Sequence, residues 1–177
     1  MPQKTIPEEL ISGLIQAEEW DKVREQFALC HPADIADIID RSPQDAHRQL
    51  FSLVAEDLQS DVLAELEEVA EIDVLEALTV EEISDLVEEM APDDAADIIA
   101  DLPAERSRKI LELMEDEESE DVRELLKYDE ESAGGIMTTD VVAMLENQTA
   151  QEALDTISSM DPEDKFIYTY IVTKDNK

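Results

Sequence analysis

The segments "HPADIADIID" (His31–Asp40) and "APDDAADIIA" (Ala91–Ala100) share Pro, Asp, Ala, Asp, Ile and Ile in register, 60 residues apart. Sixty is a multiple of twelve, and a twelve-residue period connects the two segments. Two adjacent apolar residues recur at that interval in seven copies, and another apolar residue follows three positions after most pairs. The pairs are Ile38-Ile39, Leu50-Phe51, Val62-Leu63, Val74-Leu75, Leu86-Val87, Ile98-Ile99 and Ile110-Leu111.

Twelve residues accommodate one helix of about two turns and a tight connection. Such a helix is too short to be stable alone, and its apolar residues at i, i+1 and i+4 lie on one side. The repeat therefore predicts a mostly α fold, a superhelical solenoid of short helices from about residue 6 to 128. The segment before Cys30, with Trp20 and Phe27, predicts one or two longer capping helices. Four prolines stand where a first-turn proline is tolerated: Pro32, Pro43, Pro92 and Pro103.

The composition is strongly acidic, with 48 Asp and Glu against 13 Lys and Arg and a net charge of −35. This charge repels nucleic acid and anionic membrane surfaces, so we expect no nucleic-acid partner and favour cations or basic proteins. The single cysteine, Cys30, cannot form an internal disulfide and suits a reducing compartment. We find no signal peptide and no stretch of 18 apolar residues, so we expect no membrane span in this sequence.

Aspartate precedes the apolar pair in five of the seven copies, at Asp37, Asp61, Asp73, Asp85 and Asp97. We call these five positions the acidic column. Equivalent positions of a solenoid align in space, so these carboxylates should form rows, although alternate helices can lie in different layers. A solvent-facing position that accepts any polar residue explains the column equally well.

The acidic column is most pronounced around Asp97, because Asp93 and Asp101 extend it by one helical turn in each direction. Asp93 also belongs to a second acidic column at the helix starts, where negative charge is favourable. Like charges four residues apart repel, and a divalent cation removes that cost. One helix face cannot enclose an ion, so a second surface is required.

Other chemistry has little support in the sequence. His31 and His47 lie in different repeats without a second cysteine, which argues against a zinc site. The run "EDEESEDVRE" (Glu115–Glu124) lacks the central glycine of an EF-hand and indicates a solvated helix start or linker. No phosphate-binding glycine loop or nucleophile motif is present, so we do not expect an enzyme.

The pattern changes after Asp129, where Gly134-Gly135 predicts a hinge or tight turn. A β-prone segment "VVAML" follows, then a helix from Thr149 with Glu152 completing a capping box. The segment "FIYTYIVTK" (Phe166–Lys174) alternates in β-branched and aromatic residues and predicts a strand. Together these elements form a strand–helix–strand unit whose sheet is incomplete.

The repeats, "PDDAADII", the junction "SAGGIMT" and the strand "IYTYIV" together resemble the cytosolic N-terminal region of MgtE-type magnesium transporters. The resemblance implies an acidic helical-repeat domain over residues 1–128, a linker over 129–135 and part of a CBS domain over 136–177. It further implies a homodimeric parent protein with a CBS pair and a transmembrane pore, this region lying on the cytoplasmic side of the cell membrane.

In such a protein Mg²⁺ binds between the acidic faces of the helical domain and the CBS pair and stabilises the closed pore, and low Mg²⁺ releases it. By motif, Asp93 and Asp97 match positions that face the interdomain ions, and Asp61 matches a further metal-facing acid. The resemblance, not the residues, selects Mg²⁺ over Ca²⁺ or Mn²⁺.

Two alternatives remain open from the sequence. A protein–protein scaffold of the flagellar motor-switch kind would use the acidic rows to bind a basic partner, but would continue with helical repeats after residue 130. A soluble CBS-type regulator would sense an adenine nucleotide and use the solenoid as its effector arm.

Overall fold

The computed structural model describes residues 8–129, 132–138, 141–159 and 168–173. The chain separates into two compact units, a helical unit (residues 1–137) and a strand–helix–strand unit (residues 138–177). Each unit is described by itself below.

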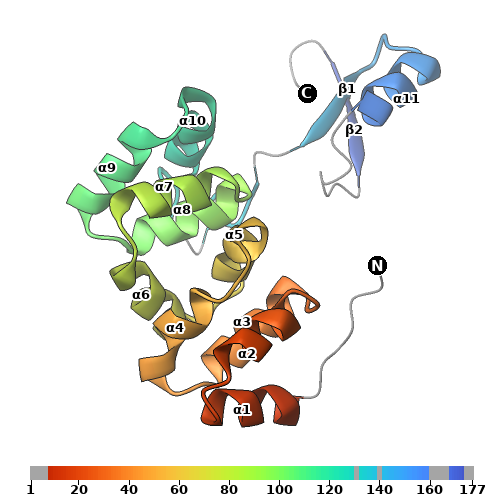
Figure 1. The fold of residues 1–177 in the computed structure, drawn as a ribbon. Helices are drawn as coiled ribbons and strands as arrows, with labels where there is room; N and C mark the ends of the chain where they lie inside the picture. The colour runs from red at the N-terminus through yellow and green to blue at the C-terminus, as the bar shows by residue number, and fades with distance from the viewer. Residues whose placement is uncertain (1–7, 130–131, 139–140, 160–167, 174–177) are drawn as a thin grey trace. The chain divides into compact units, whose positions relative to one another are not determined.

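The helical unit is a succession of short helices joined by tight connections (Figure 1). Its elements are α1 (Glu8–Gln16), α2 (Trp20–Phe27), α3 (Pro32–Asp40), the 3-10 turn η1 (Gln44–Ala46), α4 (His47–Phe51), α5 (Glu56–Ala64), α6 (Glu68–Ala77), α7 (Val80–Glu88), α8 (Pro92–Asp101), α9 (Ala104–Leu113) and α10 (Asp116–Leu125). The run predicted as a helix start or linker contains the start of α10. The twelve-residue repeat therefore corresponds to one short helix per copy, except in the second copy, which consists of η1 and α4.

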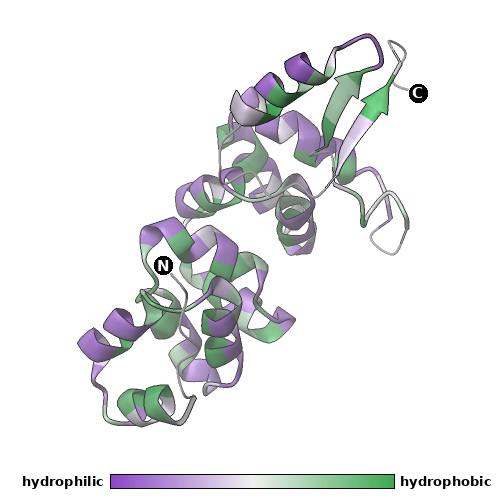
Figure 2. Ribbon diagram, turned by 90° about the vertical axis from the view of Figure 1, so that its right-hand side faces the viewer, coloured by the Kyte–Doolittle hydropathy of each residue, from purple (hydrophilic) through white to green (hydrophobic). Residues whose placement is uncertain are grey.

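The core of the helical unit consists of the apolar pairs of the repeat. Every pair contributes at least one fully buried side chain, for example Ile39 and Leu50 at 0% exposure and Ile99 at 1%. Polar residues occupy the other sides of the same helices, so that hydrophobic and hydrophilic residues alternate along each ribbon (Figure 2). The predicted mostly α solenoid is confirmed, because neighbouring copies bury the face that no single helix could bury alone.

Helices two apart in sequence pack most closely against each other. In one series α3 packs on α5 and α7 on α9, and in the other α4 packs on α6 and α8 on α10. One hydrogen bond connects such a pair, since Ser84 of α7 donates to the Ile110 carbonyl of α9 at 3.4 Å. The alternation between two layers means that consecutive copies of a repeat position do not lie in one row.

Two details of the prediction were wrong. In the described part of the segment before Cys30, α1 and α2 span 9 and 8 residues, no longer than most of the repeat helices. The second repeat is not one helix, because the 3-10 turn η1 stands in place of its first turn and leaves α4 with only 5 residues.

Arg106 joins α9 to the end of α6, and its guanidinium donates to the carbonyls of Leu75, at 2.8 Å, and Leu78. These carbonyls belong to the helix C-terminus, where a cation is favourable. We expect Arg106→Ala to lower the free energy of unfolding by about 1.5 kcal/mol, because hydrogen bonds from a charged donor are lost.

Urea denaturation monitored by circular dichroism measures this effect. The control is Arg108→Ala on the same helix, whose exposed side chain makes only a 3.7 Å ion pair with Glu112. The control should change stability by less than about 0.5 kcal/mol. Equal losses in the two variants would contradict the structural role of Arg106.

The strand–helix–strand unit contains β1 (Val142–Leu145), α11 (Ala150–Ser159) and β2 (Thr169–Val172). The strands pair in parallel, with Val142 opposite Thr169. The predicted capping box is present, since the Thr149 backbone N–H donates to Glu152 at 2.7 Å and the Glu152 N–H donates to the Thr149 hydroxyl at 3.3 Å. The predicted strand at Phe166–Lys174 begins and ends outside the described residues, and its described part contains β2.

Candidate cation-binding surface

Helix α8 presents an apolar side to the core and an acidic side away from it. Pro92 opens the helix at its first position, and the apolar side consists of Ala95, Ala96, Ile98 and Ile99, all buried. The four aspartates of the helix occupy the remaining positions: Asp93, Asp94, Asp97 and Asp101. We call these four residues the α8 acidic face.

Among the ion pairs of the described residues, none neutralises the α8 acidic face. Within the part of the chain that the structure describes, the lysine and arginine ion pairs involve other acids and none reaches an aspartate of α8. Asp93 is half-buried, and its Oδ1 atom is shielded from solvent without a hydrogen-bond partner. Burial, followed by the charges of Asp93 and Asp101, raises the pKa of Asp97. The negative charge on this face is therefore both costly and uncompensated.

The structure adds Glu71 of α6, which the sequence interpretation missed. Burial, followed by the charges of Asp101 and Asp97, raises the pKa of Glu71 to about 7. Its Oε1 atom is shielded from solvent and has no hydrogen-bond partner. A carboxylate from a second helix thus belongs to the same acidic surface.

A sequence signal for Glu71 exists. It stands three residues before the apolar pair, a position occupied in other repeats by Ile35, Ile83 and Ala95, all at 0% exposure. Other repeats carry His47, Gln59 and Ser107 at this position, so the period marks Glu71 as a residue that can be buried but does not single it out.

The α8 acidic face also lies close to acidic residues at α5. Burial raises the pKa of Asp94, followed by the charges of Asp93, Asp97, Glu65 and Asp61. Asp61 is exposed on α5, in electrostatic contact with Asp94. The structure therefore brings all three predicted site residues into one acidic region, with Asp93 and Asp97 on α8 and Asp61 on its margin.

Two other members of the acidic column have structural partners. Asp73 accepts hydrogen bonds from Gln44 at 3.1 Å and His47 at 3.0 Å, and Asp37 pairs with Arg41 at 3.2 Å. Asp73 and Asp97 thus share a repeat position but differ in surroundings. The column is not one functional row.

Acids outside the column also cap helix starts. The carboxylate of Asp40 accepts from the Glu67 N–H at 3.1 Å, at the beginning of α6. The carboxylate of Glu88 accepts from the Glu115 N–H at the beginning of α10. Both contacts satisfy backbone donors that a helix leaves unpaired, so these carboxylates have a structural explanation.

The donor set suits a hard divalent cation but is incomplete. Carboxylate oxygens are the ligands that Mg²⁺ and Ca²⁺ prefer. Among the residues that the structure describes, no three Asp, Glu, His or Cys side chains are placed to hold one ion together. The α8 acidic face therefore fits one half of a site that a second surface would complete.

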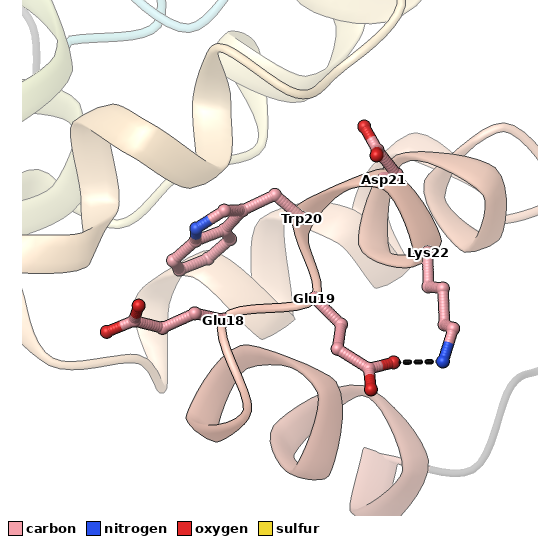
Figure 3. Close-up of a pocket in the computed structure, with 5 residues that line it drawn as sticks. All are labelled: Glu18, Glu19, Trp20, Asp21 and Lys22. Atoms are coloured by element: carbon pink, nitrogen blue, oxygen red, sulfur yellow. Dashed lines mark ion pairs between the residues drawn. The ribbon is translucent and has the colours of Figure 1, made fainter.

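The described residues also form a surface hollow of about 430 Å³ between α1 and α2 (Figure 3). Glu19 and Lys22 form an ion pair there, and the half-buried Trp20 ring points away from that pair, toward the side of Glu18. Most of its lining side chains are exposed, which does not suggest a small-molecule site.

Residues 30–131 match the model of the family described as the MgtE intracellular N domain. The chain belongs to this family. The MgtE resemblance expected from the sequence is thereby confirmed, and so is the intracellular placement that the family carries.

Two solved structures resemble this MgtE-family chain over 96% of its length. One is the cytosolic domain of the Mg²⁺ channel MgtE in complex with ATP, with 25% identity, a TM-score of 0.79 and 70% of that chain covered. The other is the soluble part of a magnesium transporter, with 26% identity, a TM-score of 0.71 and 67% of that chain covered. Among curated proteins no sequence matches at a significant level.

In the described residues no helix has both the length and the apolar character needed to span a bilayer.

Proposed function

We propose that this chain is a magnesium-sensing regulatory region of a Mg²⁺ channel or transporter. The α8 acidic face supports the proposal most directly, because it combines uncompensated carboxylates with membership of the MgtE family. Asp93 and Asp97 are the proposed principal ligands, and Asp61 contributes from α5. Glu71 adds charge that a bound cation would relieve.

The proposed sensor works by bridging two acidic surfaces. Mg²⁺ binds oxygen ligands, keeps several of its waters and relies on few carboxylates. The α8 acidic face supplies one side, and the CBS pair of the same full-length chain supplies the other. An ion between them offsets the repulsion and holds the closed pore, and its loss lets the surfaces separate.

The energetics suit a graded sensor. An ion that binds only the closed arrangement stabilises it by RT ln(1 + [Mg²⁺]/Kd), about 1.4 kcal/mol per site at tenfold excess over Kd. Several weak sites together shift a two-state equilibrium over a narrow concentration range.

The proposed domain organisation follows the same scheme. Residues 1–128 are the acidic sensor, 129–135 the linker and 136–177 the first part of a CBS domain. The parallel β1–α11–β2 arrangement supports a CBS assignment for the last segment. The remaining partners are the transmembrane pore and a second copy of the full-length chain.

The test compares two double variants in the full-length protein. We expect Asp93→Asn with Asp97→Asn to raise the Mg²⁺ concentration that protects the closed state from proteolysis by about threefold or more, because one proposed bridging site is lost. The measured quantity is the midpoint of protection against Mg²⁺ concentration.

The matched control is Glu81→Gln with Asp85→Asn, the same two repeat positions on α7, which are exposed. The control should leave the midpoint unchanged. Equal midpoints for the test variant and the unmodified protein would refute the site assignment.

Adenine-nucleotide binding by residues 138–177 is a second candidate function. The observation that favours it is that one similar structure is a complex with ATP. An ATP titration of the chain, monitored by NMR signals of β1, α11 and β2, distinguishes nucleotide binding from cation binding at α8.

A further inference from the structure

A buried histidine joins helices α4 and α6 in the helical unit. His47 is 2% exposed and occupies the same repeat position as the core residues Ile35 and Ile83. Its Nδ1 lies 3.0 Å from Oδ2 of Asp73, and its Nε2 lies 3.1 Å from the carbonyl oxygen of Ser42. Both ring nitrogens of this buried side chain therefore face oxygen atoms.

Both oxygens act as acceptors. The Ser42 carbonyl has no proton to donate. The hydrogen bond from Gln44, followed by that from His47, holds the pKa of Asp73 below its usual range, so its carboxylate is ionised. Only the imidazolium form of histidine carries an N–H on both nitrogens, and a neutral ring would leave one lone pair facing an acceptor.

We propose that His47, the Asp73 carboxylate and the Ser42 carbonyl form a proton-dependent latch that holds α4 against α6. The latch is closed while the ring carries two protons. Loss of one proton breaks one hydrogen bond and removes the positive partner of Asp73 from a buried location. The packing of the N-terminal repeats on the rest of the helical unit then weakens as pH rises.

One other cation, Arg48, lies near the latch, and the remaining described charged groups around the ring are acidic. From α6, Asp73 faces the ring, while Glu76 is engaged by Arg48 of α4 at 2.8 Å. Arg48 also donates to the Asp73 carbonyl at 2.8 Å. From α3, the charge of Asp40 acts on His47, and from η1, Asp45 lies beside Arg48 and Asp73. The surroundings are mainly acidic, so deprotonation of His47 leaves Asp73 with Arg48 as its nearby cation.

The contact made by the other histidine, His31, depends on pH in the opposite direction. His31 is exposed and caps α3, where its Nδ1 accepts from the Ala33 N–H at 3.3 Å. That contact requires an unprotonated Nδ1, so it is lost as pH falls. The His47 latch is present at low pH and lost as pH rises through the range in which histidine changes charge, about pH 5 to 8.

The first experiment detects the ring protons in the 177-residue chain by long-range ¹H–¹⁵N NMR at pH 5 to 9. We expect both nitrogens of His47 to carry a proton in the folded chain at pH 6, as the contacts with the two acceptor oxygens require. A neutral His47 ring at pH 6 in the folded chain would overturn the proposal. This measurement needs no substitution in the latch.

The second experiment isolates the contribution to stability. His31→Asn retains a good helix cap and removes the other titrating ring. In this background we compare urea unfolding with and without His47→Gln at pH 6 and pH 9. The folded-to-unfolded ratio should fall about tenfold more between these pH values when His47 is present, the factor expected for a hydrogen bond to a charged group.

The high pKa of Glu71 is common to both chains and cancels in that comparison. The same pH dependence with and without His47 would refute the latch.

Discussion

Replacing Ile99 with alanine is expected to lower the free energy of unfolding by about 3 kcal/mol. Ile99 is 1% exposed and lies on α8, whose buried side packs on α7 and α10. Truncation removes three side-chain carbons from a region that neighbouring helices cannot refill without moving, so the loss combines transfer and cavity terms. Domains of this size are stable by about 5–15 kcal/mol, so the change is a large fraction of the total.

Urea denaturation monitored at 222 nm measures this loss as a lower midpoint. The control is Leu113→Ala on α9, which removes a side chain that is 53% exposed. We expect the control to change stability by less than about 1 kcal/mol. If both variants lost the same free energy, the apolar pair would not be the core of the repeat.

Because solenoids depend on contacts between neighbouring repeats, the Ile99 variant should lose structure first around α7–α10. Amide hydrogen exchange detects this as reduced protection there before the rest of the helical unit.

Glu71→Gln is expected to stabilise the chain by about 2 kcal/mol at pH 8 and to have little effect near pH 4. The pKa of Glu71 is raised from 4.5 to about 7, so the folded state binds the proton more tightly than the unfolded state. The stability linked to this proton is fully present below pH 4.5 and is lost as pH rises through 7. The full pKa shift corresponds to about 3.4 kcal/mol in the free energy of unfolding. We expect the smaller value of about 2 kcal/mol because solvent screens a half-buried side chain.

Chemical denaturation of both chains between pH 4 and 8.5 measures this difference. The control is Glu120→Gln, an exposed position in α10, which should give a small shift that does not depend on pH. A destabilised Glu71→Gln chain at pH 8 would show that the carboxylate makes a favourable contact there. Added Mg²⁺ should reduce the advantage of the variant if a cation binds the α8 acidic face.

Most of the fold follows from the sequence because the twelve-residue period and the side on which apolar residues fall are local properties. The positions of Ile39, Leu50 and Ile99 in the repeat predict their burial without knowledge of how the helices are arranged. The two corrected details do not follow from the period. The 3-10 turn η1 replaces the first turn of one repeat helix, and the described parts of α1 and α2 are as short as most repeat helices.

The acidic positions separate what the sequence determines from what it cannot. By itself the sequence determines that aspartates recur at one position and that Asp93, Asp97 and Asp101 stack on one helix. Only the tertiary structure decides that Asp73 contacts His47, whereas the charge of Asp97 acts on Glu71 and Asp97 forms no ion pair with a basic side chain among the described residues. Asp73 and Asp97 both belong to the same stacked series, on α6 and α8, so their different surroundings come from the side chains that other helices bring beside each of them. Electrostatic repulsion depends on distance in space, which a twelve-residue period does not specify.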